Sequence, residues 1–243
     1  MDKRDACDIS IIVPALNEEE NIASVINSCL RAIAESGLTG EIIAVDDGSR
    51  DSTAGIIKGF LGRGDPVGMI SHARPQGVGA CFWDGVSRAS GRAVVFIPGD
   101  GENDPREILR YYARLKDVDM VIPYALNKHA RTRRRQILSR VFRYAVNALF
   151  AIRLNYTNGT VLYRKAVLEE AKNRETGFFF QADILIRLLK KRHSFAEVPY
   201  RIGFRKKGKS KLASFQALLQ VVIAISRLWW QVHISRRKEY ESV

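Results

Sequence analysis

The sequence predicts an α/β fold in which a mostly parallel sheet is covered by helices on both faces. In the first half of the chain, apolar segments of strand length alternate with helical segments, which is the pattern of successive β-α units. The strand segments are apolar almost throughout, as expected of strands buried on both sides. A length of 243 residues, with 46% hydrophobic and 27% charged residues, is ordinary for a folded globular chain.

The predicted elements follow one another with short connections. Strands are expected at residues 8–16, 40–47, 67–73, 92–99, 119–125 and 194–205, and a mixed segment at 158–167. Helices are expected at 17–35, after the cap candidates at 51–53, at 78–89, from Asp104-Pro105 onward, and at about 136–150, 182–191 and 213–233. We find no internal repeat and no low-complexity linker.

The charge balance favours anionic partners. The net charge is +13, and the basic residues concentrate from Lys128 onward. Nucleic acid, an anionic membrane surface and phosphorylated substrates all fit this excess. The cysteines (Cys7, Cys29 and Cys81) are scattered, which favours a reducing compartment over a disulfide scaffold or a zinc site. The N-terminus runs directly into the first predicted strand, and no signal peptide is visible.

Unusual residues follow three of the predicted strands. These strand ends read Pro14 to Glu18, Asp46 to Ser49, and Pro98 to Glu102. Because ligands of open α/β sheets bind at the carboxyl ends of the strands, the three ends predict one site.

The third strand end carries a dense acidic cluster, Asp100, Glu102 and Asp104. Such close like charges repel one another unless a cation lies between them. Two interpretations stay open. The acids form a solvated turn with Asp104 capping the next helix, or they hold a metal ion.

Several blocks resemble a known enzyme family. IIVPALNEEENI, AVDDGSRDST and ARPQGVGACFWDGVSRASGRAVVFIPGDGENDP resemble successive blocks of inverting family 2 glycosyltransferases, which have the Rossmann-like GT-A fold. FFFQADILIRLLKKRHSFAEVPYRIGFRKKGKSKL resembles the branch of dolichyl- or polyprenyl-phosphate sugar synthases. The resemblance runs in order over residues 8–212. It implies a GT-A catalytic domain at 1–211, followed by an amphipathic helix and basic tail at 212–243.

The resemblance implies a site for a nucleotide diphosphate-sugar donor. Asp46 and Asp47 are expected to bind the nucleotide, with Pro14 and Glu18 flanking the same pocket. The alternatives are an Asp-Gly-Ser turn and a first-turn acid that favours the helix dipole.

The run RPQGVG, residues 74–79, resembles the family block R-N-x-G-x-G. The resemblance implies that Arg74 serves a phosphate and that small residues such as Gly79 let backbone amides approach the donor. A glycine-rich turn between a strand and a helix is also common in unrelated α/β proteins.

The family usually shows D-x-D where this chain has Pro98 and Asp100, and often Gln where it has Glu102. We therefore expect Asp100 and Glu102 to hold Mg²⁺ or Mn²⁺, which would bridge the donor diphosphate and assist departure of the nucleotide. Asp104 is interpreted as a helix cap.

The acceptor site is expected in the basic half of the chain. By the resemblance, Arg205 and Lys211 bind an acceptor phosphate, with Arg135 as a second contact. A solvated basic surface is the alternative. Asp183 is a candidate general base for a hydroxyl acceptor, whereas an ionised phosphate needs no base. The stretch NYTNGT, residues 155–160, departs from the branch pattern and leaves the acceptor open.

The stretch ALLQVVIAISRLWW near the C-terminus is shorter than the roughly 20 apolar residues that span a bilayer. On a helical wheel, Leu218, Val222, Ile225, Trp229 and Val232 share one face. An interfacial helix on an anionic membrane is expected, and packing on the catalytic domain or on a sister subunit is the alternative.

The functional expectation is transfer of a sugar from a nucleotide diphosphate-sugar to a polyprenyl phosphate by a cytoplasmic enzyme peripherally bound to the membrane. A homo-oligomer or a membrane-protein partner is compatible with the sequence. One alternative is a hydroxyl acceptor on a glycan or glycolipid. Another is a non-catalytic nucleic-acid-binding protein, although no specific nucleic acid is expected, because basic charge alone is unspecific.

Overall fold

The structure is a computed structural model of the 243-residue chain. It describes residues 7–62, 64–127, 133–157, 159–171, 174–201, 203 and 215–235, and the side chains of residues 133–135, 138 and 215–218 are outside this description.

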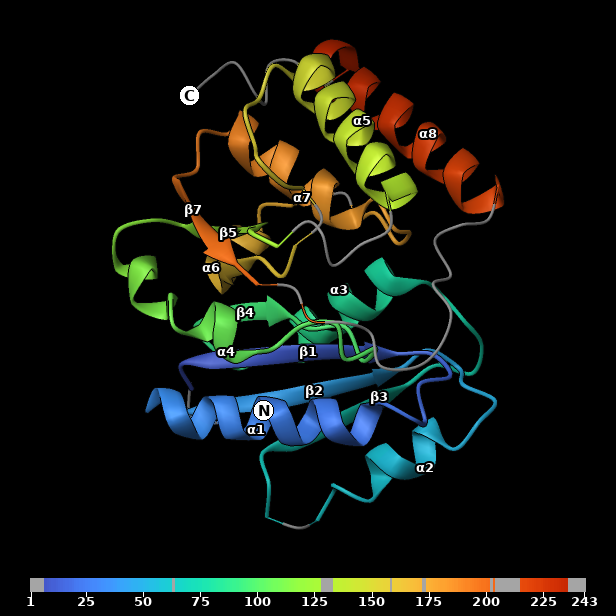
Figure 1. Ribbon diagram of the computed structural model, residues 1–243, viewed down its shortest axis with the longest axis vertical. Coiled ribbons are helices and arrows are strands. Elements are labelled where there is room, and N and C mark those ends of the chain that lie inside the picture. The colour runs from blue at the N-terminus through green and yellow to red at the C-terminus, as the bar shows by residue number, and fades with distance from the viewer. Residues whose placement is uncertain are drawn as a thin grey trace.

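A seven-stranded sheet forms the centre of the fold, in the order β3-β2-β1-β4-β6-β5-β7. The strands are β1 (Ile9–Ala15), β2 (Gly40–Asp46), β3 (Val67–Ser71), β4 (Ala93–Phe96), β5 (Met120–Ala125), β6 (Leu162–Arg164) and β7 (Phe195–Tyr200). Among the described strands, only β6 runs antiparallel to its neighbours, so the carboxyl ends of the other strands lie along one edge. Figure 1 shows the arrowheads of β1, β2 and β4 on the same side.

Helices cover both faces of the sheet because alternate residues of each strand point to opposite sides. Ile11 and Val13 of β1 belong to the core under α1 (Ile22–Ser36), α2 (Thr53–Lys58) and α4 (Arg106–Leu109). Ile12 belongs to the core under α3 (Val78–Arg88) and α7 (Phe180–Lys190). The predicted fold class, a mostly parallel sheet between two helical layers, is confirmed.

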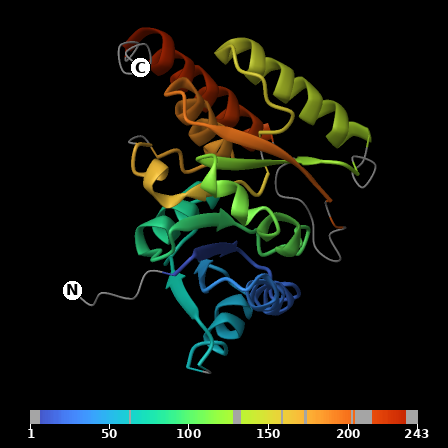
Figure 2. The ribbon, with the colours of Figure 1, turned by 90° about the vertical axis from the view of Figure 1, so that its left-hand side faces the viewer.

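A third core lies on the outer side of α7. It joins α7 to α5 (Arg133–Phe150) and α8 (Phe215–Trp230), and α8 continues as a π-helical turn, Gln231–Ser235. The remaining helical segments are Tyr112–Lys116 and α6 (Lys165–Leu168). Figures 1 and 2 both place α5 and α8 side by side at the opposite end of the molecule from α1 and α2.

The structure divides the predicted apolar face of the last helix between core and surface: Val232 is buried and Ile225 packs against the core, and the side chain of Leu218 is outside the description. Ala224, Leu228 and Val232 are the residues buried against α5 and α7, whereas Val222 and Trp229 are exposed. The helix therefore has apolar residues on two sides. One side packs on the protein's own core, as the alternative interpretation expected, and the other faces outward. Among the described helices, none is both long enough and apolar enough to cross a membrane.

The first helix also begins later than predicted, at Ile22 instead of Asn17. Asn17 has a left-handed backbone with φ of 51°, which does not continue into a helix. The five residues before Ile22 form a turned segment at the sheet edge, and this segment contributes to the candidate site.

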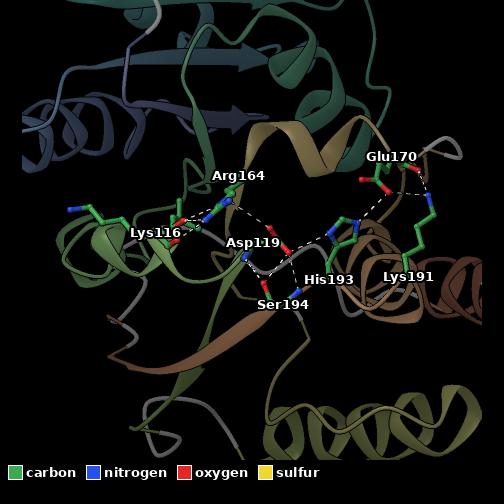
Figure 3. Close-up of polar contacts among 8 residues, drawn as sticks. Lys116, Asp119, Arg164, Glu170, Lys191, His193 and Ser194 are labelled. Carbon is green, nitrogen blue, oxygen red and sulfur yellow. Dashed lines mark hydrogen bonds and ion pairs between the residues drawn. The ribbon is translucent and has the colours of Figure 1, made fainter. Parts of the chain in front are cut away.

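An ionic network connects the amino ends of β5 and β7, at the edge of the sheet opposite the carboxyl ends (Figure 3). Asp119, just before β5, accepts hydrogen bonds from the backbone N and Oγ of Ser194, just before β7, at 3.0 and 2.9 Å. Burial raises the pKa of Asp119, but these hydrogen bonds and His193 outweigh it, so the pKa lies below its usual value. His193 lies between Asp119, at 3.4 Å, and Glu170, at 3.2 Å.

Candidate active site

The end of β1 joins the two neighbouring strand ends. The backbone N of Asp47 donates to Ala15 O at 2.8 Å, and the N of Gly99 donates to Pro14 O at 3.0 Å. The three segments predicted to meet, residues 14–18, 46–49 and 98–102, therefore lie side by side. We call these segments the rim.

Reciprocal hydrogen bonds fix the first two segments of the rim against each other. The N of Asn17 donates to Ser49 Oγ at 2.9 Å, and the N of Arg50 donates to Asn17 Oδ1 at 2.8 Å. The half-buried Glu18 donates its N to Thr53 Oγ1 at 2.8 Å and accepts from Asn21 Nδ2 at 3.0 Å. These bonds explain the left-handed turn at Asn17, because that conformation directs its amide and side chain toward the second segment.

The adjacent acids Asp46 and Asp47 have different surroundings, although both are buried. Within the part of the chain that the structure describes, Asp46 accepts two long hydrogen bonds, from Ser49 N at 3.3 Å and Ser71 Oγ at 3.4 Å. Asp47 accepts from Gln76 N at 2.8 Å and Gly77 N at 3.0 Å. The carboxylate of Asp47 thus holds the loop that follows β3.

This loop carries Arg74, whose side chain is exposed. Its backbone crosses close to the rim, since a Cβ on Gly48 would come within 2.8 Å of the Arg74 Cα. Gly48 also has a φ of 72°, which favours glycine. The close approach of the two loops therefore places the Arg74 backbone beside Gly48, in the second segment of the rim.

Gly79 packs against backbone rather than opening toward the rim. Its N donates to Thr176 O at 2.8 Å, and an added Cβ would lie 2.4 Å from Glu175 O and 2.8 Å from the Phe180 Cβ. Its absence of a side chain lets the start of α3 contact the segment before α7. Backbone amides of this block were expected to approach the donor. The amide of Gly79 is not available for this, because it already donates a hydrogen bond to Thr176 O.

The third segment of the rim carries two acids on one turn. Asp100 Oδ1 accepts from Glu102 N at 3.0 Å, and Glu102 is 8% exposed. In the described part of the chain, no third acid, histidine or cysteine lies close enough to complete a three-residue cluster with them. Asp104 Oδ1 accepts from Arg106 N at 3.0 Å, as a helix-capping acid does.

Asp183 forms a buried ion pair one turn into α7. Arg187 Nε lies 2.9 Å from its Oδ2, and a second guanidinium nitrogen lies 3.0 Å from its Oδ1. The same guanidinium donates to Gln231 Oε1 at 2.6 Å. Burial raises the pKa of Asp183, and Arg187 offsets this only in part.

One further cluster has metal-like composition. Single ligand atoms of Asp47, His72 and Cys81 lie within 4.8 Å of one another. However, Asp47 Oδ1 and His72 Nδ1 are 2.7 Å apart, which is a hydrogen-bond distance and shorter than the about 3.3 Å between two ligands on a tetrahedral zinc. Burial and the Asp47 carboxylate also raise the pKa of the Cys81 thiol, which disfavours the thiolate. We interpret this cluster as hydrogen-bonded.

Residues 10–171 match the family described as glycosyl transferase family 2. The chain belongs to this family. A dolichol-phosphate mannosyltransferase of Pyrococcus furiosus is 28% identical to this family 2 chain over 245 residues, covering 97% of the chain and 68% of that protein. A dodecaprenyl-phosphate galacturonate synthase of Rhizobium johnstonii is 26% identical over 169 residues, covering 68% of the chain and 50% of that protein. The chain thus spans half the length of the rhizobial relative.

Solved structures share the fold of this family 2 chain. The glucosyl-3-phosphoglycerate synthase from Mycobacterium tuberculosis, in complex with Mn²⁺, UDP and glucosyl-3-phosphoglycerate, superposes with a TM-score of 0.70 at 22% identity, covering 91% of this chain and 80% of that one. The predicted GT-A fold is confirmed by this likeness.

Of the predicted site residues, the structure brings Pro14, Glu18, Asp46, Asp47, Asp100 and Glu102 to the rim, with Arg74 beside it. Arg205 and Lys211 lie outside the described residues, as does the side chain of Arg135. The roles assigned to all these residues stay predictions. Sequence reasoning missed His72, which gives no motif, and Arg187, whose spacing of four residues from Asp183 on a helix was an available signal.

We expect Gly79→Ala to lower the free energy of unfolding by about 1–3 kcal/mol, because the added methyl overpacks the contact between α3 and the segment before α7. Gly55→Ala is the matched control, since a Cβ at Gly55 in α2 meets nothing within 4 Å. Alanine there is expected to stabilise by up to about 1 kcal/mol. Urea unfolding of both variants measures the difference, and a Gly79→Ala protein as stable as the wild type would contradict the packing role.

Proposed function

We propose that this family 2 chain transfers a sugar from a nucleotide diphosphate-sugar to a polyprenyl phosphate. The observation that carries the proposal is the rim. Asp46 and the Asp100–Glu102 turn come from separate strands and are held at one edge of a parallel sheet by hydrogen bonds to the end of β1.

The donor nucleotide is proposed to lie along the rim. Asp46 is the better candidate for hydrogen bonds to a base or ribose, because its carboxylate accepts only two long bonds among those described. Pro14 and Glu18 flank it. Asp47 acts by holding the 74–77 loop, and the exposed Arg74 guanidinium is the proposed contact for a donor phosphate.

A divalent cation fits the third segment of the rim. Asp100 and Glu102 supply hard carboxylate oxygens on a single turn, which suits Mg²⁺ or Mn²⁺. Two protein ligands leave coordination positions for the donor diphosphate, as is usual for Mg²⁺ with nucleotides. The mycobacterial structures with Mn²⁺ and UDP support this arrangement. When bound, the cation would offset charge on the departing nucleotide.

The acceptor is proposed to be a lipid phosphate because the names of the two relatives contain dolichol phosphate and dodecaprenyl phosphate. The Asp183 carboxylate supports this choice. Both of its oxygens are paired with Arg187, which suits a positioned structural acid more than a base that takes a proton. A phosphate oxygen is already ionised near neutral pH and can attack the anomeric carbon in line, with inversion.

The outer side of α5 and α8 is proposed to bind an anionic membrane surface at the cytoplasmic face. Its exposed apolar side chains include Tyr144, which is 62% exposed, and Trp230, which is 56% exposed. Others are Ile137, Val141, Leu149, Leu219, Val222, Ile223, Trp229 and Ile234. Arg140 and Arg227 add exposed cations on the same two helices, and cations beside aromatic side chains suit an interface with anionic lipid.

Calorimetric titration with UDP, GDP and dTDP tests the donor site. We expect one of them to bind with Mn²⁺ and to bind at least about tenfold more weakly with EDTA, because Asp100 and Glu102 would hold a cation that offsets the charge of the diphosphate. Asp100→Asn should remove the metal dependence. Asp104→Asn is the matched control on the same loop, since that acid caps α4 and should leave binding unchanged. Failure of all three nucleotides to bind would overturn the proposed function.

The acceptor class is tested by Asp183→Asn in a transfer assay, normalised to the folded fraction. A phosphate acceptor predicts activity within about tenfold of the wild type, whereas loss of a general base costs roughly 10²–10⁴-fold. Arg187→Gln is the control because it breaks the same ion pair and keeps the carboxylate. A severe loss in Asp183→Asn alone would favour a hydroxyl acceptor.

Membrane binding is tested by sedimentation with vesicles of phosphatidylcholine and phosphatidylglycerol. Replacing Tyr144 and Trp230 by Ser should weaken binding by at least about tenfold, because two large apolar side chains no longer enter the interface. Leu61→Ser, at an exposed position after α2, should have no effect. If these variants instead dissociate a dimer, the surface is a subunit interface and the membrane proposal fails.

A further inference from the structure

The His72 side chain lies between two carboxylates next to the rim. Its Nδ1 is 2.7 Å from Asp47 Oδ1, and its Nε2 is 3.0 Å from Asp84 Oδ2 on α3. The His72 side chain is only 6% exposed. Each ring nitrogen therefore lies within hydrogen-bonding distance of a carboxylate oxygen. The ring therefore ties the end of β2 to α3.

The Asp47 carboxylate that His72 orients is also the one that folds the 74–77 loop. It accepts from the amides of Gln76 and Gly77, and Pro75 has no amide to offer. The cation that this loop offers to a diphosphate is the exposed Arg74 guanidinium, and the Arg74 backbone rests against Gly48. The position of Arg74 thus depends on an acid that is itself held by His72.

We infer that His72 is a positioning residue for the donor diphosphate. Through Asp47 it fixes the loop that presents Arg74, and Asp84 anchors the far side of the ring. His72 itself touches no donor atom in this arrangement. The inference rests on the proposed function, since it requires a nucleotide diphosphate-sugar at the rim.

Two substitutions separate the two sides of the ring. Asparagine places an amide nitrogen near the position of Nδ1 and keeps a donor for Asp47, whereas glutamine reaches the position of Nε2 and keeps only the Asp84 side. We expect His72→Gln to weaken binding of the nucleotide in Mn²⁺ roughly tenfold, the value of one hydrogen bond to a charged group. His72→Asn should stay within about threefold of the wild type.

The matched control is His193, which lies between Asp119 and Glu170 at the opposite edge of the sheet (Figure 3). His193→Gln removes the same kind of bridge, so it reproduces any general loss of stability. Its nucleotide affinity should equal that of the wild type. In steady-state assays, His72→Gln should raise the donor KM while kcat and the acceptor KM stay near wild-type values.

A double-mutant cycle tests the route through Arg74. If His72 acts by placing Arg74, then His72→Gln weakens nucleotide binding no further in a protein that already carries Arg74→Ala. Additive losses would overturn the inference, and so would equal losses in His72→Gln and His193→Gln. Unchanged affinity in His72→Gln, with the wild type binding UDP, GDP or dTDP, would overturn it while leaving the proposed function intact. A wild type that binds none of them would overturn the proposed function itself.

Discussion

The hydrogen bonds accepted by Asp47 are the interaction on which the rim depends. A single buried carboxylate bonds to the ring of His72 and to the amides of Gln76 and Gly77, while its own backbone N donates to Ala15. It therefore joins β1, β2 and the loop after β3. An isolated carboxylate in such a place would be costly to bury, and the donors around it compensate for the lost water.

Helix α7 has a comparable role at the other end of the molecule. Its inner side packs under the sheet with α3, and its outer side forms the core with α5 and α8. The ion pair of Asp183 and Arg187 lies on this helix and extends to Gln231 beyond α8. The side chains of Arg187 and Gln231 thus link α7 to the last helix, which carries part of the surface proposed to meet the membrane. The start of α7 in turn lies beside Gly79. Both partners of the ion pair lie on α7, and the hydrogen bond from Arg187 to Gln231 connects this helix to the turn that follows α8.

The sequence was enough to predict the fold class and the rim, because both follow from local patterns. Apolar runs that end in Pro14, Asp46 or Pro98 define parallel strands and their carboxyl ends without knowledge of tertiary contacts. The different surroundings of Asp46 and Asp47 could not be predicted. They depend on which loop folds over each acid, and that loop comes from a segment about 30 residues away.

The division of the predicted apolar face of α8 between core and surface could not be predicted for a related reason. A helical wheel separates apolar from polar residues, but it does not show which apolar side meets the core when a helix has two. Packing against Phe150 and Ile186 selected Ala224 and Leu228. His72 was missed because an isolated histidine carries no motif, and its importance appears only when Asp47 and Asp84 are seen on either side of it.

The acidic rim of a strongly basic chain has a consistent physical explanation. A nucleotide diphosphate is itself negative, so carboxylates beside it are unfavourable unless a cation neutralises both. The charge of Asp47 is stabilised without a cation, because the carboxylate accepts hydrogen bonds from the protein. The charge of Asp104 is stabilised by the backbone amide at the start of α4. Asp100 and Glu102 share a turn at which a divalent ion could bridge protein and ligand. The excess of basic residues in the second half of the chain then suits the proposed acceptor, a phosphate that would approach the donor against its own charge.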